Sequence, residues 1–545
     1  MRVALLALSL VAGCAAQDLS TAAAAEGFTP QCSTTAECPA STVCRAPYGV
    51  CVTPEHNGST VALSVSPPSK LAPALHLGQQ TFSAQNTLDV SIRRTVEMTG
   101  FVKAGLNLVP ATLVAVARDN VIPGVSMRTQ TTFKPGVGRG GQPEPFRLLL
   151  YAGIAYRLTV TIDDGGATPP HHEDILFDAT TGHDVALPDP ESYVRFCGGV
   201  RVMQGGMPTG IKGVRVTAVQ PESDDQCTSA VTNQNGSYEL RCPGGGDLSV
   251  VHSGSEGGPL LPTFTVNFEE DAFEYQDNAK CYGLPDVLIP AETTETEATV
   301  EVVDGSGAPV PGMTVTASTV FEGGVWHDAV LRVEGTTGAD GRAVLAVLAG
   351  TYRVTVAPHP TDPWAVAVHD EPWDVALSPT KEVTLSSKVM LTTSVVDASG
   401  RPVVGAKVVA TTSLVDEETK TTIGREYVAE TSEDGGFQLA VDPERDYDVE
   451  VIPTDESGLP RWWLSQPLKV LAGGAAPAAF KLDPPSLIEG RVFDAQGTPV
   501  ADTAIDVYTA PASEKSEEGP PRLIGRGVSD AEGRYFLILP CPKLP

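Results

Sequence analysis

The residues of this sequence that could do chemistry are few, and their spacing fits none of the common catalytic motifs. There is no H-E-x-x-H pair, no G-x-S-x-G elbow, no P-loop, and no G-x-G-x-x-G between a strand and a helix. The nine histidines are scattered, apart from the adjacent pair His171 and His172. We therefore predict a protein that has no catalytic residues, uses no cofactor and is not an enzyme.

Two kinds of residue cluster could bind a metal ion, and we weigh each against a solvated loop. Residues 169–174 read P-P-H-H-E-D, with His183 nearby, but ligands adjacent in sequence seldom face one ion. The acidic runs at 269–271 and 416–418 could offer oxygen atoms to calcium, but neither has the spacing of an EF-hand loop. A solvated loop is the favoured interpretation of each, so no metal site is predicted.

Trp462 and Trp463, which follow Arg461, are the candidate ligand-binding residues. Exposed indole rings would offer flat apolar faces on which a glycan could stack. The favoured alternative places one ring in a core and the other over a strand edge, because tryptophan is usually largely buried.

The N-terminus has the features of a secretory signal. Arg2 supplies a positive charge, and a short apolar run and small residues lead to Cys14. The run is shorter than the roughly 20 residues that a membrane-spanning helix needs. The sequence L-V-A-G-C at 10–14 resembles the lipobox of bacterial lipoproteins. This resemblance implies lipidation of Cys14 after cleavage of residues 1–13 and, with alanine at position 15, sorting to the outer membrane. The alternative is an ordinary signal peptide with an incidental cysteine.

The remaining nine cysteines form two groups of four and one single residue. In an exported protein, disulfides are the default. The spacing C-x5-C-x5-C-x6-C lacks the close pairs of a zinc site, so we predict a small module closed by two disulfides of open connectivity. Its members are Cys32, Cys38, Cys44 and Cys51.

The second group allows a prediction of pairing. Cys227 and Cys242 lie symmetrically about the Asn235-Gly236 turn, which is a strong hairpin signal. They are expected to face each other and form a disulfide, which leaves Cys197 with Cys281.

Composition favours many short strands and an acidic surface. The 545 residues include 53 glycines and 45 prolines, and valine and threonine recur throughout. The formal net charge is −30, from 67 acidic and 37 basic side chains, so nucleic acid is not expected as a partner.

The C-terminal half contains a repeated pattern. V-V-D-G-S-G-A-P-V, V-V-D-A-S-G-R-P-V and V-F-D-A-Q-G-T-P-V begin at Val302, Val395 and Val492. A second glycine turn and an alternating strand follow each one, and two repeats continue into Tyr-x-Val-x-Val at Tyr352 and Tyr447, whose tyrosine and valines should share a buried face. Weaker copies upstream bring the count to five repeats of roughly 95 residues, each large enough for its own core.

The pattern G-x-P-V-x-G-A-x-V followed by D-G-x-F/Y-x-L resembles carboxypeptidase regulatory-like domains. This resemblance implies immunoglobulin-like or transthyretin-like β-sandwiches. The sequence matches the pattern closely over residues 299–540 and less closely over the residues before them. We predict an all-β chain of tandem sandwiches after a lipoprotein signal and a cysteine-rich module. The expected segments are a signal peptide (1–13), a tether (14–31), the cysteine-rich module (32–56), and sandwiches 1 to 5 (60–190, 194–290, 298–388, 391–483 and 487–545).

The final repeat ends early. After the strand 534–539 come three prolines in six residues, which cannot supply ladder donors. We expect sandwich 5 to lack at least one strand, to show an unpaired edge, and to leave Cys541 free or intermolecular. A truncated gene end is the alternative.

Together these features predict a non-enzymatic, lipid-anchored envelope protein, structural or adhesive, at the outer membrane or cell surface. Its expected contacts are the membrane, through the lipid on Cys14, and an envelope protein or glycan. The alternatives are a carbohydrate-binding surface lipoprotein and an accessory subunit of an envelope hydrolase.

Overall fold

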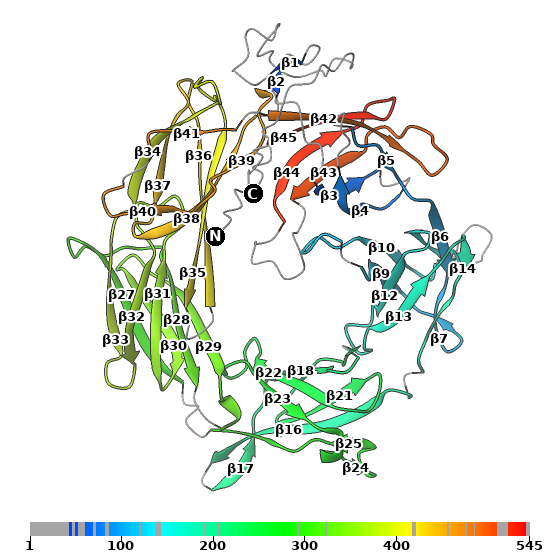
Figure 1. The fold of residues 1–545 in the computed structure, drawn as a ribbon. Coiled ribbons are helices and arrows are strands. Elements are labelled where there is room, and N and C mark those ends of the chain that lie inside the picture. The colour runs from blue at the N-terminus through cyan, green and yellow to red at the C-terminus, as the bar shows by residue number, and fades with distance from the viewer. Residues whose placement is uncertain are drawn as a thin grey trace, which may run out of the picture.

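The described part of the chain folds into β-strands, as predicted, with two 3₁₀ turns and no α-helix. The computed structural model describes residues 43–45, 50–52, 60–68, 72–81, 87–119, 121–136, 143–189, 191–204, 206–223, 225–290, 295–321, 324–416, 421–454, 457–474, 477–483, 485–509 and 521–540. The strands form five β-sandwiches that follow one another around a ring (Figure 1). The predicted fold class, tandem β-sandwiches, is confirmed.

Sandwiches 1 and 2 each pack two main sheets, β10-β9-β12-β13 on β11-β6-β14, and β19-β18-β22-β23 on the sheet around β16. Sandwich 1 comprises β6 (Thr95–Gly100), β7 (Val102–Ala104), β8 (Asn107–Leu108), β9 (Ala111–Ala117), β10 (Arg128–Phe133), β11 (Phe146–Tyr151), β12 (Ala155–Ile162), β13 (His171–Leu176), β14 (Thr181–Gly182) and β15 (Val185–Leu187). Sandwich 2 comprises β16 (Val194–Gln204), β17 (Met207–Gly210), β18 (Val214–Gln220), β19 (Asp225–Gln226), β20 (Ala230–Val231), β21 (Ser237–Cys242), β22 (Leu248–Gly254), β23 (Phe264–Phe268), η2 (Glu270–Ala272), β24 (Glu274–Gln276), β25 (Cys281–Gly283) and β26 (Val287–Ile289).

Sandwiches 3 and 4 are the most regular, with ladders β29-β28-β31-β32 on β30-β27-β33, and β36-β35-β38-β39 on β37-β34-β41. Sandwich 3 comprises β27 (Glu295–Asp304), β28 (Thr314–Phe321), η3 (Gly324–Trp326), β29 (Ala329–Thr336), β30 (Arg342–Leu348), β31 (Thr351–Ala357), β32 (Ala367–Asp374) and β33 (Thr380–Leu385). Sandwich 4 comprises β34 (Val389–Val396), β35 (Lys407–Asp416), β36 (Thr421–Glu430), β37 (Gly436–Val441), β38 (Arg445–Ile452), β39 (Trp462–Trp463), β40 (Leu468–Val470) and β41 (Phe480–Lys481).

The repeated sequence pattern has a physical cause in two turns. In the first, the carboxylate of Asp397 accepts hydrogen bonds from the backbone amides of Ser399 and Arg401, at 2.8 and 2.9 Å. In the second, Gly435 has φ of +74°, and a Cβ there would lie 2.6 Å from the carbonyl oxygen of Val395. Only glycine fits such a position, so the motif marks a turn and not a catalytic site.

The Tyr-x-Val-x-Val strands are buried on the predicted face. Tyr352, Val354 and Val356 of β31 are at most 1% exposed, and β38 repeats the pattern. The Tyr352 hydroxyl donates a hydrogen bond to the carbonyl of Leu348 at 3.0 Å, which satisfies a polar group that the core would otherwise isolate.

The described residues of the final repeat supply only four strands, so it lacks strands of its own as predicted, but strands from early in the chain complete the fifth sandwich. It combines β42 (Pro485–Phe493), β43 (Ala504–Thr509), β44 (Leu523–Val528) and β45 (Arg534–Pro540) with β3 (Thr60–Ser66), β4 (Leu75–Thr81) and β5 (Val90–Ser91). Strand β3 pairs with β43 over six residues, and β5 runs parallel to β42 (Figure 1, blue beside orange). We call this unit the composite sandwich.

The composite sandwich is a complete repeat whose two halves lie at opposite ends of the chain. Its ladder β4-β3-β43-β44 matches β32-β31-β28-β29 of sandwich 3, and β5 pairs with β42 as β33 pairs with β27. The prediction that the last sandwich shows an unpaired edge where its strand is missing is therefore wrong, because β3 pairs with β43 there. The predicted boundary at residue 60 is also wrong, since sandwich 1 begins at β6.

Contacts join all five sandwiches around the ring. Sandwiches 2 and 3 share one hydrophobic core, and so do sandwich 1 and the composite sandwich. Between sandwiches 1 and 2, the guanidinium of Arg157 lies 3.6 Å from the carboxylate of Asp225. Between sandwiches 3 and 4, the backbone amide of Val366 donates a hydrogen bond to the carboxylate of Asp442. Trp463 of sandwich 4 packs against the core of the composite sandwich and sandwich 1, which closes the ring.

Candidate functional site

Several predicted sites lie outside the described residues. They are the lipidation site Cys14, Cys32 and Cys38 of the cysteine-rich module, and Cys541. The short strands β1 (Val43–Arg45) and β2 (Val50–Val52) pair antiparallel, with Cys44 and Cys51 as direct backbone partners.

Sandwich 2 contains the two predicted disulfides. Cys227 is bonded to Cys242, with Cα atoms 4.3 Å apart, and Cys197 is bonded to Cys281, with Cα atoms 5.9 Å apart. The expected hairpin is not one continuous ladder, because β20 pairs with β18 in one sheet and β21 with β16 in the other. The Cys227–Cys242 bond therefore clips the two sheets of the sandwich together.

The tryptophan pair is not an exposed binding site. Trp462 is 7% exposed and belongs to the core of sandwich 4, where its ring lies 5.9 Å from that of Phe480. Trp463 is half-buried against the composite sandwich and sandwich 1. Both rings are used for packing, so the glycan-stacking interpretation of these two residues is wrong.

The adjacent histidines are separated by strand geometry. Successive side chains of β13 point to opposite faces. Nδ1 of His172 lies 3.0 Å from the hydroxyl of Thr159, whereas Nε2 of His171 lies 4.0 Å from the carboxylate of Glu173. Nε2 of His183 lies 2.8 Å from the other oxygen of Glu173. Among the described residues, no group of three or more histidine, cysteine or acidic side chains is arranged to hold a metal ion.

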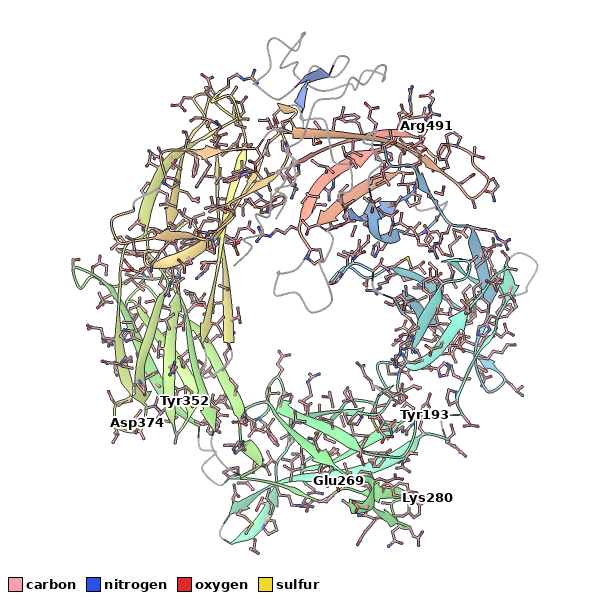
Figure 2. The ribbon with its side chains drawn as sticks, viewed as in Figure 1. Tyr193, Glu269, Lys280, Tyr352, Asp374 and Arg491 are labelled. Atoms are coloured by element: carbon pink, nitrogen blue, oxygen red, sulfur yellow. A yellow bond between two sulfur atoms is a disulfide. The ribbon has the colours of Figure 1, made fainter. Side chains whose placement is uncertain are left out.

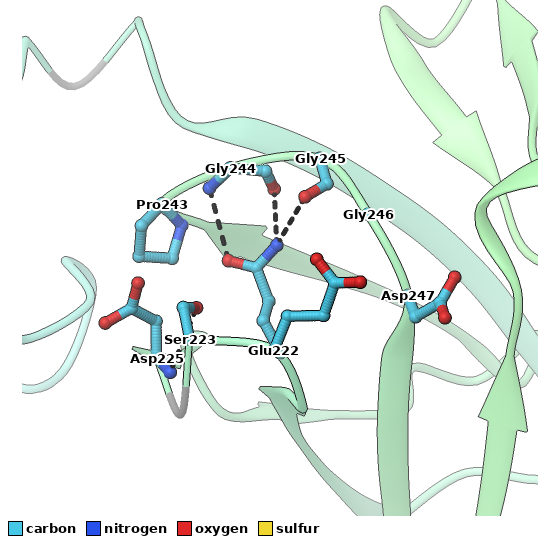
Figure 3. A pocket seen from close by; sticks show the side chains of 9 residues that line it. Glu222, Ser223, Asp225, Pro243, Gly244, Gly245, Gly246 and Asp247 are labelled. Carbon is cyan, nitrogen blue, oxygen red and sulfur yellow. Dashed lines mark hydrogen bonds between the residues drawn. The ribbon is translucent and has the colours of Figure 1, made fainter.

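One open pocket, of about 290 Å³, lies in sandwich 2 between the β18–β19 turn and a glycine loop (Figure 3). The amide of Gln220 holds this loop in place. Its nitrogen donates to the carbonyls of Gly244 and Gly245, at 3.0 and 2.8 Å, and its oxygen accepts from the amide of Gly244. The buried side chain of Gln220 thus holds this wall of the pocket through three hydrogen bonds.

The lining of this pocket suits contact with cations better than covalent catalysis. It presents the carboxylates of Glu222, Asp225 and Asp247. Ser223 is the one hydroxyl in the lining, and no histidine, cysteine or lysine lies there to activate it. Asp247 also accepts a hydrogen bond from the amide of Glu270 at 2.8 Å, so the pocket adjoins the acidic turn at 269–271.

A buried polar network between sandwiches 3 and 4 was not predicted from the sequence. Asp442 is 1% exposed, and its two oxygens accept hydrogen bonds from the amide of Val366 at 3.2 Å and the hydroxyl of Tyr427 at 2.7 Å. Burial, together with the Asp442 carboxylate, raises the pKa of Tyr427 well above its usual range. The ammonium of Lys388 lies 4.9 Å from the centre of the Tyr427 ring. This network links the two sandwiches, and both Asp442 and Tyr427 are buried in it.

Among the described residues, no helix has the length and apolar character needed to cross a membrane. No known protein family matches the sequence, and no curated protein matches it.

Several solved structures show a partial likeness. A streptococcal ancillary pilin matches with 12% identity and a TM-score of 0.21, over 54% of this chain and 99% of the pilin. The Bacillus anthracis TIE protein matches with 13% identity and a TM-score of 0.16, over 73% of this chain and 76% of that one. The major pilin subunit of Bacillus cereus matches with 10% identity and a TM-score of 0.16, over 55% of this chain and 99% of the subunit. At these scores the likeness carries no argument about function, and the fold class rests on the strand pairing.

Proposed function

We propose that this protein is a non-enzymatic, lipid-anchored component of a bacterial cell envelope that displays a closed ring of β-sandwiches as a structural or adhesive scaffold. The pairing of β3 with β43 is the observation that carries the proposal. It turns a string of domains into a ring whose sandwiches are fixed by shared cores and polar contacts. Such an object holds surfaces at fixed positions, which is what a scaffold requires.

The anchor would attach at one point of this ring. Cys14 precedes the first residue of β3, Thr60, by 46 positions, so a lipid on Cys14 would tether the ring through the composite sandwich. Sandwiches 2 and 3 lie across the ring from this sandwich (Figure 1).

Cell fractionation tests the anchor. Replacing Cys14 by serine is expected to move the protein from washed membranes to the soluble fraction, because the thiol that would carry the lipid is gone. A Cys44→Ser variant is the control, since it also removes one cysteine but leaves the lipobox intact. Continued sedimentation of Cys14→Ser with membranes after a high-salt wash would refute the lipid anchor.

Protease treatment of intact cells tests the display. Loss of the protein from whole cells, with a periplasmic marker protected, is expected for a surface scaffold. Full protection until the outer membrane is opened would place the ring inside the envelope.

A further inference from the structure

One sheet of sandwich 2 carries a row of side chains that runs out of the core into solvent. Direct strand partners lie on the same face of a sheet. The register places Leu240, Phe196, Tyr282 and Tyr275 in one row across β21, β16, β25 and β24. Their exposed fractions rise along it from 0% and 1% to 39% and 55%. The core face of this sheet therefore extends past the opposing sheet and leaves two tyrosines uncovered.

Ring contacts fix these tyrosines in place. The ring of Phe273, which is half-buried, packs edge-on against that of Phe196, with ring centres 5.2 Å apart. The ring of Tyr282 lies 5.9 Å from that of Phe196 and 5.2 Å from that of Tyr275. The planes of Tyr282 and Tyr275 meet at 67° in an edge-to-face contact, so the two rings together present a bent aromatic surface to solvent.

A disulfide holds the strands that carry this aromatic surface. Cys281, beside Tyr282, is bonded to Cys197, beside Phe196, which ties β25 to the centre of the sheet. The β24–β25 turn closes through Lys280, whose φ of 53° lies in the left-handed region. The two rings are therefore organised before any partner binds, which lowers the entropy cost of binding.

The chain around these rings is strongly acidic. Residues 269–280 contain five carboxylates and one ammonium group, so their net charge is −5 + 1 = −4. All six charged side chains are exposed: Glu269, Glu270, Asp271, Glu274, Asp277 and Lys280. Figure 2 shows Lys280 at the outer rim of sandwich 2.

We propose that this surface, centred on Tyr275 and Tyr282, binds a lysine- and arginine-rich segment of a partner protein. The face of an aromatic ring attracts ammonium and guanidinium groups, and the exposed carboxylates of residues 269–277 give this part of the sandwich the opposite charge. A neutral oligosaccharide would use the rings but gain nothing from the net charge of −4. The inference rests on the geometry of sandwich 2 and holds whether or not Cys14 carries a lipid.

Binding of the full-length protein, in non-ionic detergent, to an immobilised hexaarginine peptide tests this proposal. The variant Tyr275→Ser/Tyr282→Ser is expected to weaken binding about tenfold, from the loss of two cation–π contacts. Both tyrosines are exposed, so the variant should keep its fold, which circular dichroism and the melting temperature would verify. Binding equal to that of the unmodified protein would overturn the proposal.

A matched pair of charge variants separates this surface from the overall acidity of the protein. Glu274→Gln/Asp277→Asn is expected to weaken hexaarginine binding about threefold, and 1 M salt should abolish it. Glu382→Gln/Glu433→Gln removes the same charge from exposed positions on sandwiches 3 and 4 and should leave binding unchanged. Equal effects of both variants would show non-specific attraction. Salt-insensitive binding that maltohexaose displaces would show a surface for neutral glycans.

Discussion

The hydroxyl of Tyr535 donates a hydrogen bond to the backbone carbonyl of Leu88, 447 residues earlier in the chain. Tyr535 lies on β45, is 3% exposed, and reaches across the seam of the composite sandwich to the residue two before β5. Burial is the main cause that raises the pKa of this hydroxyl, so it remains protonated and can donate throughout the physiological range. The bond directly joins the N-terminal and C-terminal segments that close the ring.

Removal of this hydroxyl should weaken the seam. Tyr535→Phe is expected to lower the free energy of unfolding of the composite sandwich by about 1–2 kcal/mol, because a buried carbonyl loses its donor. Thermal unfolding followed by calorimetry would measure the change. Tyr508→Phe, at a half-buried position of the same sandwich, is the control. Equal melting temperatures for the two variants would contradict the role of the Tyr535 bond.

A cavity created in β3 should destabilise the C-terminal strands β43 and β45. Leu63 is fully buried and is the direct partner of Val507. Leu63→Ala is expected to cost about 2–5 kcal/mol and to raise hydrogen exchange across β43 and β45. Leu439→Ala, in the core of sandwich 4, should leave those strands protected. Unchanged exchange over 504–509 in the Leu63 variant would mean that β3 does not support the C-terminal strands.

His252 should make sandwich 2 less stable in acid. It is fully buried and stacked on Phe264, and burial lowers its pKa to about 4. Between pH 4 and its ordinary value of about 6.5, the unfolded chain binds a proton that the folded chain does not. Stability is therefore complete above about pH 6.5 and falls as the pH drops towards 4, by at most about 3 kcal/mol.

A His252→Leu variant isolates this effect. Denaturant unfolding at pH 7 and pH 4.5 should show a larger loss of stability in the unmodified protein than in the variant, by about 2–3 kcal/mol. Parallel pH profiles of the two proteins would show that the histidine is protonated equally in both states.

The junction between sandwiches 3 and 4 should depend on the hydroxyl of Tyr427. In Tyr427→Phe, the buried carboxylate of Asp442 loses one of its two donors, at an expected cost of about 1.5–3 kcal/mol. Calorimetry would measure the loss, and spin-label distances between the two sandwiches should broaden. Tyr282→Phe, which removes an exposed hydroxyl, is the control. If Tyr427→Phe is as stable as this control and its spin-label distance distribution is as narrow, the role of the Tyr427 hydroxyl at this junction is contradicted.

The sequence allowed the repeat and its turns to be predicted because these depend on local physics. Asp397 and Gly435 act through bonds and dihedral angles within a few residues. The seam between β3 and β43 could not be predicted in this way. Thr60 to Ser66 lacks the tyrosine of Tyr352 and Tyr447, and its partners follow more than 430 residues later. The strand that the last repeat was expected to lack is supplied by β3, from the segment that the sequence had assigned to sandwich 1.

The proposed binding surface was harder to find in the sequence than the disulfides. Symmetry about the Asn235-Gly236 turn was enough to pair Cys227 with Cys242. Trp462 and Trp463 attracted attention by residue type, but tertiary packing covers them. Tyr275 and Tyr282 follow the acidic run at 269–271 that was considered for calcium, and only the register of β24 and β25 shows that their rings meet.

The seam between β3 and β43 also determines what a single break in the backbone would do. In a linear string of five sandwiches, one cleavage between neighbours yields two separate fragments. Here, cleavage between sandwiches 2 and 3 would leave the two pieces held together by the ladder of the composite sandwich, away from the cut. Two breaks at different junctions are needed before any sandwich separates from the others. After a single proteolytic cut between sandwiches, the two fragments of such a protein would remain associated.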